Sequence, residues 1–247
     1  WICLTTYAMA VAAPQFEIVD IGTFGTGPCA THDISEADTA CGMGTAPNGQ
    51  SLHAFYWDGK IMHNIPPLSA PAGGNCWGFA MNSSGHIVGY STATSGNAFQ
   101  PYKWTPDGGT IDLGVPEWAA GNYGQAKDIN DAGVVVGLVG TVPNNIPVCN
   151  WIDGDMREVP TFGRDESQCF ATNERGDVVG FSRLESGTMR GFVVPLANIG
   201  NIVELEAPEG GGAQATDINE QRVVCGWGSN DDGSYHALKW SIDGGME

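Results

Sequence analysis

Positive charge is scarce in this chain of 247 residues. Lys and Arg together number 10 against 28 Asp and Glu, for a formal net charge of −18. Nucleic-acid phosphates and anionic membrane surfaces are both bound by clustered Lys and Arg. The sequence therefore predicts a protein without a nucleic-acid partner.

Several other signals are missing. No run approaches the ~20 consecutive apolar residues of a membrane-spanning helix, so no membrane insertion is expected. The chain has no Cys-x-x-Cys pair, no His-Glu-x-x-His and no Gly-x-Ser-x-Gly, the usual marks of zinc sites and serine hydrolases. We predict no metal and no cofactor, with a calcium ion held by carboxylates as the open alternative.

Glycine is what the chain has in abundance. There are 36 Gly and 14 Pro, while charged residues make up 15% and hydrophobic residues 42%. This composition supplies a core together with many tight turns, and it is typical of short strands in an all-β fold.

A repeated phrase organises these strands. A polar residue, a turn and a Val-rich run ending in Gly recur every 43 to 48 residues. We call the polar residue the anchor; the anchors are Ser35, Asn82, Asn130, Asn173 and Asn219. A second phrase follows each anchor at a nearly constant distance, as in "HAFYW" (53–57) and "HALKW" (236–240). Repeats of this length with four short strands each are typical of β-propeller blades.

The ends of the array suggest how a ring would close. The last repeat stops at "DGGME" and lacks most of a fourth strand, whereas "FEIVDIG" (16–22) resembles a fourth strand with no repeat before it. The prediction is a single five-bladed β-propeller of four-stranded blades over residues 16–247, closed by residues 16–21 as the outer strand of the last blade.

Residues 1–15 hold one cluster of small apolar residues and no charge, and they contain small-x-small triplets such as Ala8-Met9-Ala10. They are predicted to be the remnant of a signal peptide, with an ordinary first strand as the alternative. Export favours disulfides among the cysteines that remain after Cys3, although their pairing stays open. These are Cys29, Cys41, Cys76, Cys149, Cys169 and Cys225.

The phrases "LHAFYWDGKIM", "YHALKW" and Ile-Asn-x-x-Gly-x-Val-Val-Gly resemble the HAF-type extracellular repeat family, named for its His-Ala-Phe. The resemblance covers all five repeats, although His-Ala-Phe itself stands only at 53–55. It implies export and a propeller-like fold, and it implies no catalytic mechanism.

Aromatic residues that break the repeat are the first candidates for a site. Most lie in the expected loops on one face of the ring, where an asymmetric set of rings can stack on sugars or anchor a protein. The predicted ligand-binding residues are Trp77, Trp118, Tyr123, Phe162 and Trp227.

Three carboxylates form the second candidate set. Asp33, Asp128 and Asp217 each stand two residues before an anchor, on what would be the innermost strand. They would be the catalytic groups if the protein were a propeller glycoside hydrolase. The structural interpretation, in which they bond nearby backbone, is preferred.

The sequence thus favours a secreted or periplasmic binding module that recognises carbohydrate or a cell-surface protein. The rival functions are a glycoside hydrolase and a structural envelope or matrix protein.

Overall fold

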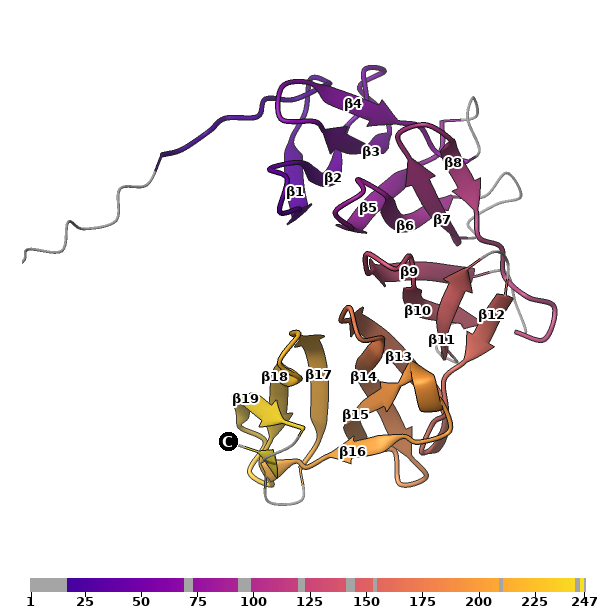
Figure 1. Cartoon of the computed structure of the whole chain (residues 1–247), viewed down its shortest axis with the longest axis vertical. Coiled ribbons are helices and arrows are strands. Elements are labelled where there is room, and N and C mark those ends of the chain that lie inside the picture. Colours follow the sequence, from indigo (N-terminus) through magenta and orange to yellow (C-terminus); the bar gives the residue numbers. More distant parts are fainter. Residues whose placement is uncertain are drawn as a thin grey trace, which may run out of the picture.

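A computed structural model describes residues 17–68, 73–92, 99–119, 123–140, 145–152, 155–208, 211–242 and 245–246. The predicted signal-peptide remnant, 1–15, lies outside the described residues, as does Phe16. The described strands form five four-stranded antiparallel sheets, which we call the first to fifth blades in chain order (Figure 1).

Consecutive strands pair in every blade, so that each blade is a simple meander. The first blade comprises β1 (Cys29–Ile34), β2 (Ala40–Thr45), β3 (Leu52–Trp57) and β4 (Met62–Ile65). The second comprises β5 (Cys76–Met81), β6 (Ile87–Thr92), β7 (Phe99–Thr105) and β8 (Gly109–Asp112). The third comprises β9 (Tyr123–Ile129), β10 (Val135–Gly140), β11 (Asn145–Ile152) and β12 (Asp155–Glu158).

The fourth blade comprises β13 (Gly163–Thr172), β14 (Asp177–Leu184), β15 (Met189–Pro195) and β16 (Val203–Leu205), with the short 3-10 helix η1 (Leu196–Asn198) before β16. The fifth comprises β17 (Ala213–Ile218), β18 (Val223–Ser229), β19 (Tyr235–Ser241) and the two-residue β20 (Gly245–Met246).

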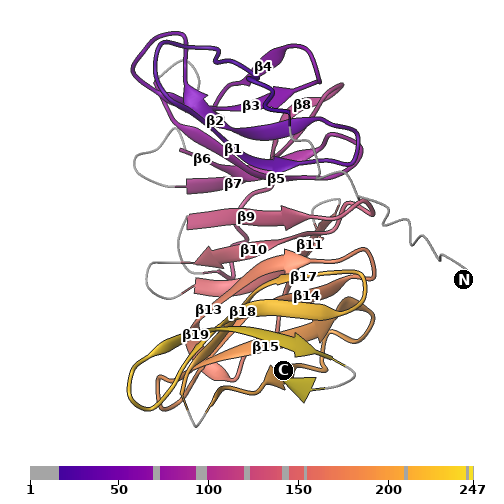
Figure 2. The ribbon, with the colours of Figure 1, turned by 90° about the vertical axis from the view of Figure 1, so that its left-hand side faces the viewer.

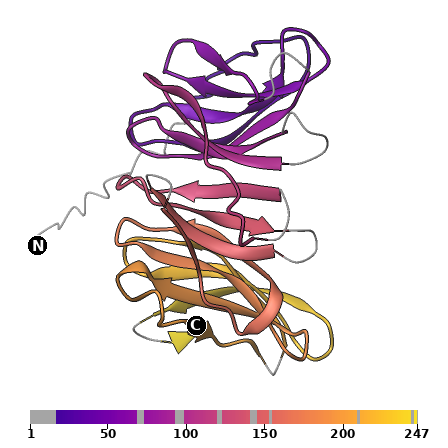
Figure 3. The same cartoon turned by 90° about the vertical axis from the view of Figure 1, so that its right-hand side faces the viewer.

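The blades follow one another along an arc, with β1, β5, β9, β13 and β17 innermost and β4, β8, β12 and β16 on the outside (Figure 1). The succession of sheets is also seen from the open side of the arc (Figure 2) and from its back (Figure 3). The predicted all-β, propeller-type fold is confirmed.

The predicted closure into a five-bladed ring is wrong. The described part of the closing segment, residues 17–21, forms no strand, and Ile18 and Val19 are 95% and 64% exposed. The outer position of the fifth blade belongs instead to β20, which pairs with β19. The prediction took the fourth strand of the last blade to be missing, whereas it is present and only two residues long. The first and fifth blades lie apart (Figure 1).

The hydrophobic core lies between neighbouring blades. The residue six positions after each anchor packs on the residue five positions after the next anchor: Cys41 lies in one cluster with Ile87, Val88 with Val135, Val136 with Val178, and Val179 with Val224. Burial of such side chains contributes about 1.5–3 kcal/mol each. The repeat therefore encodes the contact from one blade to the next.

The predicted disulfides are not formed among the described cysteines. Cys29, Cys41, Cys76, Cys169 and Cys225 are all reduced, and the side chain of Cys149 lies outside the described residues. Cys41 and Cys225 stand where the other blades have Val, and Cys41, Cys76 and Cys169 are buried. The three buried cysteines serve as small core residues, a use that the even number of cysteines in the sequence did not reveal.

Among the described residues, the structure contains no helix with the length and apolar character needed to cross a bilayer.

Candidate binding site on the inner strands

Every innermost strand contains an irregularity at the same place. The pairing with the second strand shifts around the residue three positions before the anchor. Such β-bulges leave one residue unpaired and redirect its side chain. The unpaired residues are His32, Phe79, Lys127, Phe170 and Thr216.

The carboxylates that follow two of these bulges fasten one blade to the next. Asp33 Oδ1 accepts a hydrogen bond from the backbone N–H of Ile34, and its Oδ2 accepts one from Met81 in the second blade, both at 2.8 Å. Asp128 does the same with Ile129 and with Thr172 in the fourth blade, again at 2.8 Å.

Asp217 differs from the other two. Its Oδ1 accepts from Ile218 at 2.8 Å, but no further blade follows among the described residues. Asp33 and Asp128 therefore join two blades, whereas Asp217 bonds only its own blade. A catalytic role for the three carboxylates stays a prediction.

Burial affects the carboxylate of the third blade most. Desolvation raises the pKa of Asp128 to about 6, against the opposing effect of its two backbone hydrogen bonds and with a smaller contribution from Asp217 and Asp33. Within the described ranges, no three His, Cys, Asp or Glu side chains are gathered as metal ligands.

Five aromatic rings from the second and third blades make one continuous cluster, which we call the aromatic cluster: Trp77, Phe79, Tyr90, Phe99 and Tyr123. Trp77 stacks on Tyr90 with ring centroids 4.5 Å apart, and Phe99 contacts Tyr90 at 4.8 Å and Tyr123 at 5.6 Å. All five rings are only partly buried, unlike the core ring of Tyr102, which is fully buried.

Polar groups border this cluster. Lys127 Nζ lies 4.6 Å from the centroid of the Phe79 ring, a cation–π contact, and burial lowers the pKa of Lys127 to about 8. The Gln125 side-chain amide donates to the Tyr123 hydroxyl at 2.5 Å. Burial, with Tyr123 as the smaller cause, raises the pKa of Tyr90 to about 12, so its hydroxyl stays neutral at physiological pH.

The structure brings together two of the five predicted ligand-binding residues. Trp77 and Tyr123 meet through Phe99. Phe162 instead packs against the core between the third and fourth blades, and Trp227 pairs with Tyr235 at 5.3 Å in the fifth blade. Trp118 is 49% exposed and belongs to no ring contact among the described residues. A ligand-binding role for each of these residues stays a prediction.

Sequence reasoning missed Phe79, Tyr90 and Phe99. Phe79 and Tyr90 sit on strands, where the third blade has Lys127 and Leu138 and the fourth blade has Phe170 and Phe181. The sequence prediction considered aromatic residues of the expected loops, whereas these three rings lie on β5, β6 and β7.

No protein-family model matches the chain, and no curated protein does. Among solved structures, the chain is similar to TolB from Acinetobacter baumannii, with 11% sequence identity and a TM-score of 0.54 over 84% of this chain and 51% of that one. The chain thus spans about half the length of TolB. A mutant of AofleA from Arthrobotrys oligospora, with arginines replaced by alanine, also matches, with 11% identity and a TM-score of 0.45 over 94% of this chain and 73% of that one. At this identity the likeness to TolB supports the fold alone.

Proposed function

We propose that this chain is a carbohydrate-binding propeller module of the HAF-type repeat class, exported to the periplasm or the cell exterior. The observation that carries the proposal is the aromatic cluster. Five rings from two blades touch one another and still remain partly exposed. The apolar C–H faces of sugars stack on such rings, and the sugar hydroxyls need hydrogen-bonding groups at the border.

The border of the cluster provides those groups. The hydroxyls of Tyr90 and Tyr123 are neutral at pH 7, because burial raises the pKa of both phenols. Gln125 and Lys127 add an amide and an ammonium group from β9. A neutral or acidic oligosaccharide matches this combination better than a large protein surface, because three of the five rings lie on innermost strands of the arc, Trp77 and Phe79 on β5 and Tyr123 on β9.

Calorimetric titration with a panel of neutral and acidic oligosaccharides tests the proposal. We expect Trp77→Ala to weaken binding at least tenfold, since stacked aromatic contacts contribute roughly 0.5–1.5 kcal/mol beyond burial. Trp77→Phe should recover part of the affinity.

Tyr235→Ala is the matched control, because Tyr235 is 73% exposed and lies in the fifth blade, away from the cluster. The proposal fails if no oligosaccharide binds, or if Trp77→Ala and Tyr235→Ala weaken binding equally. Binding to a protein but to no sugar would favour the cell-surface protein as ligand.

A further inference from the structure

The side of the fifth blade that faces away from the fourth blade exposes repeat positions that are buried in the other blades. Cys225 is exposed, whereas its equivalents Val88, Val136 and Val179 are fully buried. The anchor Asn219 is exposed as well, whereas Asn82, Asn130 and Asn173 are 3–4% exposed. We call this surface the fifth-blade face; it comprises Thr216, Asp217, Asn219, Glu220, Cys225 and Trp227.

Inside the arc, the anchor amides form a ladder across the blades. The side-chain N–H₂ of Asn82 donates to the carbonyl of Asn130 at 3.1 Å, that of Asn130 to Asn173 at 2.9 Å, and that of Asn173 to Asn219 at 3.2 Å. The Asn219 amide has the same position and no such partner among the described residues.

A second ladder runs beside the first. The backbone N–H of Asp131 donates to the Glu174 carboxylate at 2.9 Å, and the N–H of Glu174 donates to Glu220 at 2.8 Å. In the fifth blade the N–H of Glu220 and the Oδ2 of Asp217 lack the partner that equivalent groups have within the described arc. Two donors and one acceptor thus stand unpaired on this face, at the positions that bridge two blades elsewhere in the described arc.

The blades alternate in sequence, and the alternation specifies which kind of blade fits. Asp stands two positions before the anchor in the first, third and fifth blades, which we call odd, whereas Ala80 and Ala171 stand there in the second and fourth, which we call even. The even blades also carry Phe79 and Phe170 at the bulge.

Both carboxylates that bridge blades run from an odd blade to an even one. The even blade has no Asp of its own, so the N–H of Met81 or Thr172 is free to donate to the preceding blade. In odd blades the corresponding N–H already donates to the blade's own Asp, as Ile34 does to Asp33.

We propose that the fifth-blade face binds a further four-stranded blade of the even type, whose innermost strand ends in Phe-Ala-x-Asn-Glu, as the fourth blade does at 170–174. Its backbone N–H before the anchor meets Asp217, its anchor carbonyl accepts from Asn219, and its Glu accepts from the Glu220 N–H. These are the bonds that join the fourth blade to the third.

A second copy of this chain fits less well. Its free blade is the first, an odd one, which would place Asp33 beside Asp217 and offer an N–H that Asp33 already occupies. Like charges in a partly buried contact are unfavourable.

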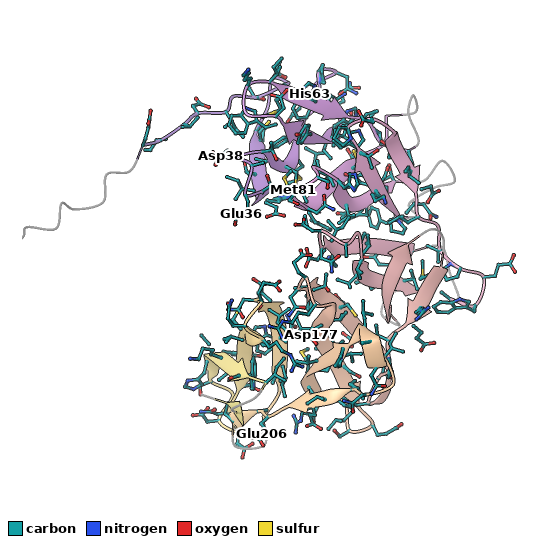
Figure 4. The ribbon with its side chains drawn as sticks, in the orientation of Figure 1. Glu36, Asp38, His63, Met81, Asp177 and Glu206 are labelled. Atoms are coloured by element: carbon teal, nitrogen blue, oxygen red, sulfur yellow. The ribbon has the colours of Figure 1, made fainter. Side chains whose placement is uncertain are left out.

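An even blade also suits the other end of the arc. Even-to-odd contacts already exist from the second blade to the third and from the fourth to the fifth. The free side of the first blade holds a pocket of about 590 Å³ lined by Val19, Ile21, Ile34, Ala40 and Trp57, among others. Glu36 and Asp38 lie on the same open side of the arc (Figure 4).

The test extends the full chain, after residue 247 and a Gly/Ser linker, by a second copy of either residues 163–208 (even) or residues 28–66 (odd). The rate at which iodoacetamide alkylates Cys225 is followed by peptide mass spectrometry. We expect the even extension to slow this rate at least tenfold and the odd extension to leave it within twofold of the parent.

The matched control is the even extension with Ala171→Asp in the appended copy only, which should restore fast alkylation. Slow alkylation of Cys41 and Cys169 in each protein verifies that the arc is folded. Equal protection by both extensions, or none by either, overturns the proposal, as does a dimeric parent in which Cys225 is already protected.

A second measurement needs no extension. Asn219→Asp should leave the melting temperature within about 1 °C of the parent, whereas Asn173→Asp should lower it by several degrees, because only Asn173 loses an amide donor to the next blade. Equal losses would show that the Asn219 amide is already bonded and that the fifth-blade face is not open. Neither measurement depends on carbohydrate binding.

Discussion

Asp128 and Thr172 belong to different blades and are joined by a hydrogen bond of 2.8 Å from the Thr172 backbone N–H to Asp128 Oδ2. The other oxygen of the same carboxylate accepts from Ile129. One side chain thus satisfies two backbone donors at a bulge and fastens the third blade to the fourth. The same geometry at Asp33 and Met81 indicates that this is a property of the repeat.

Asp128 should make stability depend on pH. Desolvation raises its pKa to about 6 from the usual 3.8, so the folded state binds the proton more tightly than the unfolded state. The contribution of this group to stability is therefore complete below about pH 4 and is lost as the pH rises through about 6. The shift corresponds to a change on the order of 2–3 kcal/mol.

Urea unfolding of the parent and of Asp128→Asn, at pH 4 and at pH 7, checks this prediction. The free energy of unfolding of the parent, relative to that of the variant, should fall between the two pH values. An unchanged or rising difference would contradict it. Asp217→Asn serves as the control, because Asp217 is the exposed equivalent in the fifth blade.

The turn position three residues after each anchor provides a matched pair of substitutions. It has positive φ in every blade and is Gly85, Gly133 and Gly176 in the three middle ones, but Asp38 (φ 54°) in the first and Arg222 (φ 60°) in the fifth. Asp38→Gly should stabilise the protein by about 0.5 kcal/mol net, because glycine tolerates this conformation while adding freedom to the unfolded chain.

Arg222→Gly should do the reverse. Arg222 Nε contacts Asp177 Oδ2 at 2.9 Å, and the Asp177 side chain is 6% exposed. Asp177 lies between the fourth and fifth blades (Figure 4). Leaving that carboxylate without the guanidinium should cost about 1–3 kcal/mol. Thermal unfolding of both variants checks the pair; a gain in Arg222→Gly would show that backbone strain outweighs the ion pair.

Much of the fold could be predicted because the repeat places similar residues at equivalent positions of each blade. The anchor amide, the turn and the Val-rich strand are each visible in sequence, and the alternation of buried and exposed residues follows from them. Ring closure could not be predicted this way, because residues 17–21 resemble an outer strand without having a neighbour to pair with. Strand pairing depends on two segments. The third strand of the fifth blade was identified from its sequence, but its partner is β20 and not residues 17–21.

The candidate site was less accessible to sequence reasoning. The carboxylates were identified by position, and the hydrogen bonds of Asp33 and Asp128 to the next blade are consistent with the preferred structural interpretation. The aromatic cluster was found only in part, since contact between Trp77 and Tyr123 depends on Phe99 and Tyr90, and their meeting depends on how two blades pack. The cysteine count predicted disulfides because sequence does not show that Cys41 replaces a core Val.

The thiols should differ widely in reactivity. Burial raises the pKa of Cys76 to about 12 and raises that of Cys41 further, so neither forms a thiolate at neutral pH. Cys225 is exposed and Cys29 partly so. Under native conditions an alkylating reagent should modify Cys225 first and leave Cys41, Cys76 and Cys169 unmodified, whereas unfolding should expose all of them.

Peptide mapping without reducing agent provides the counter-test for the thiols. Cross-linked peptides that contain two of the described cysteines would contradict the reduced structure and restore the disulfides expected from the sequence. A reducing agent should leave the melting temperature unchanged if these thiols are already reduced.

Trp77 and Trp118 should differ in what their removal does to stability, although both were expected to bind ligand. Trp77 stacks on Tyr90 at 4.5 Å and meets Phe99 edge-on at 6.3 Å, so Trp77→Ala removes packing contacts as well as the proposed stacking surface for a ligand. Trp118 is 49% exposed, and its truncation removes little packing. We expect Trp77→Ala to lose about 1–3 kcal/mol, or several degrees in melting temperature.

Trp118→Ala should melt within about 1 °C of the parent, since surface substitutions usually change stability by less than ~0.5 kcal/mol. Differential scanning calorimetry of both variants, with Trp77→Phe to keep a ring against Tyr90, separates loss of packing from loss of the indole. A Trp77→Ala protein as stable as the parent would mean that Tyr90 and Phe99 do not depend on the indole. The aromatic cluster would then be a set of independent surface rings, and stacking in the unliganded protein would no longer support the proposed sugar site.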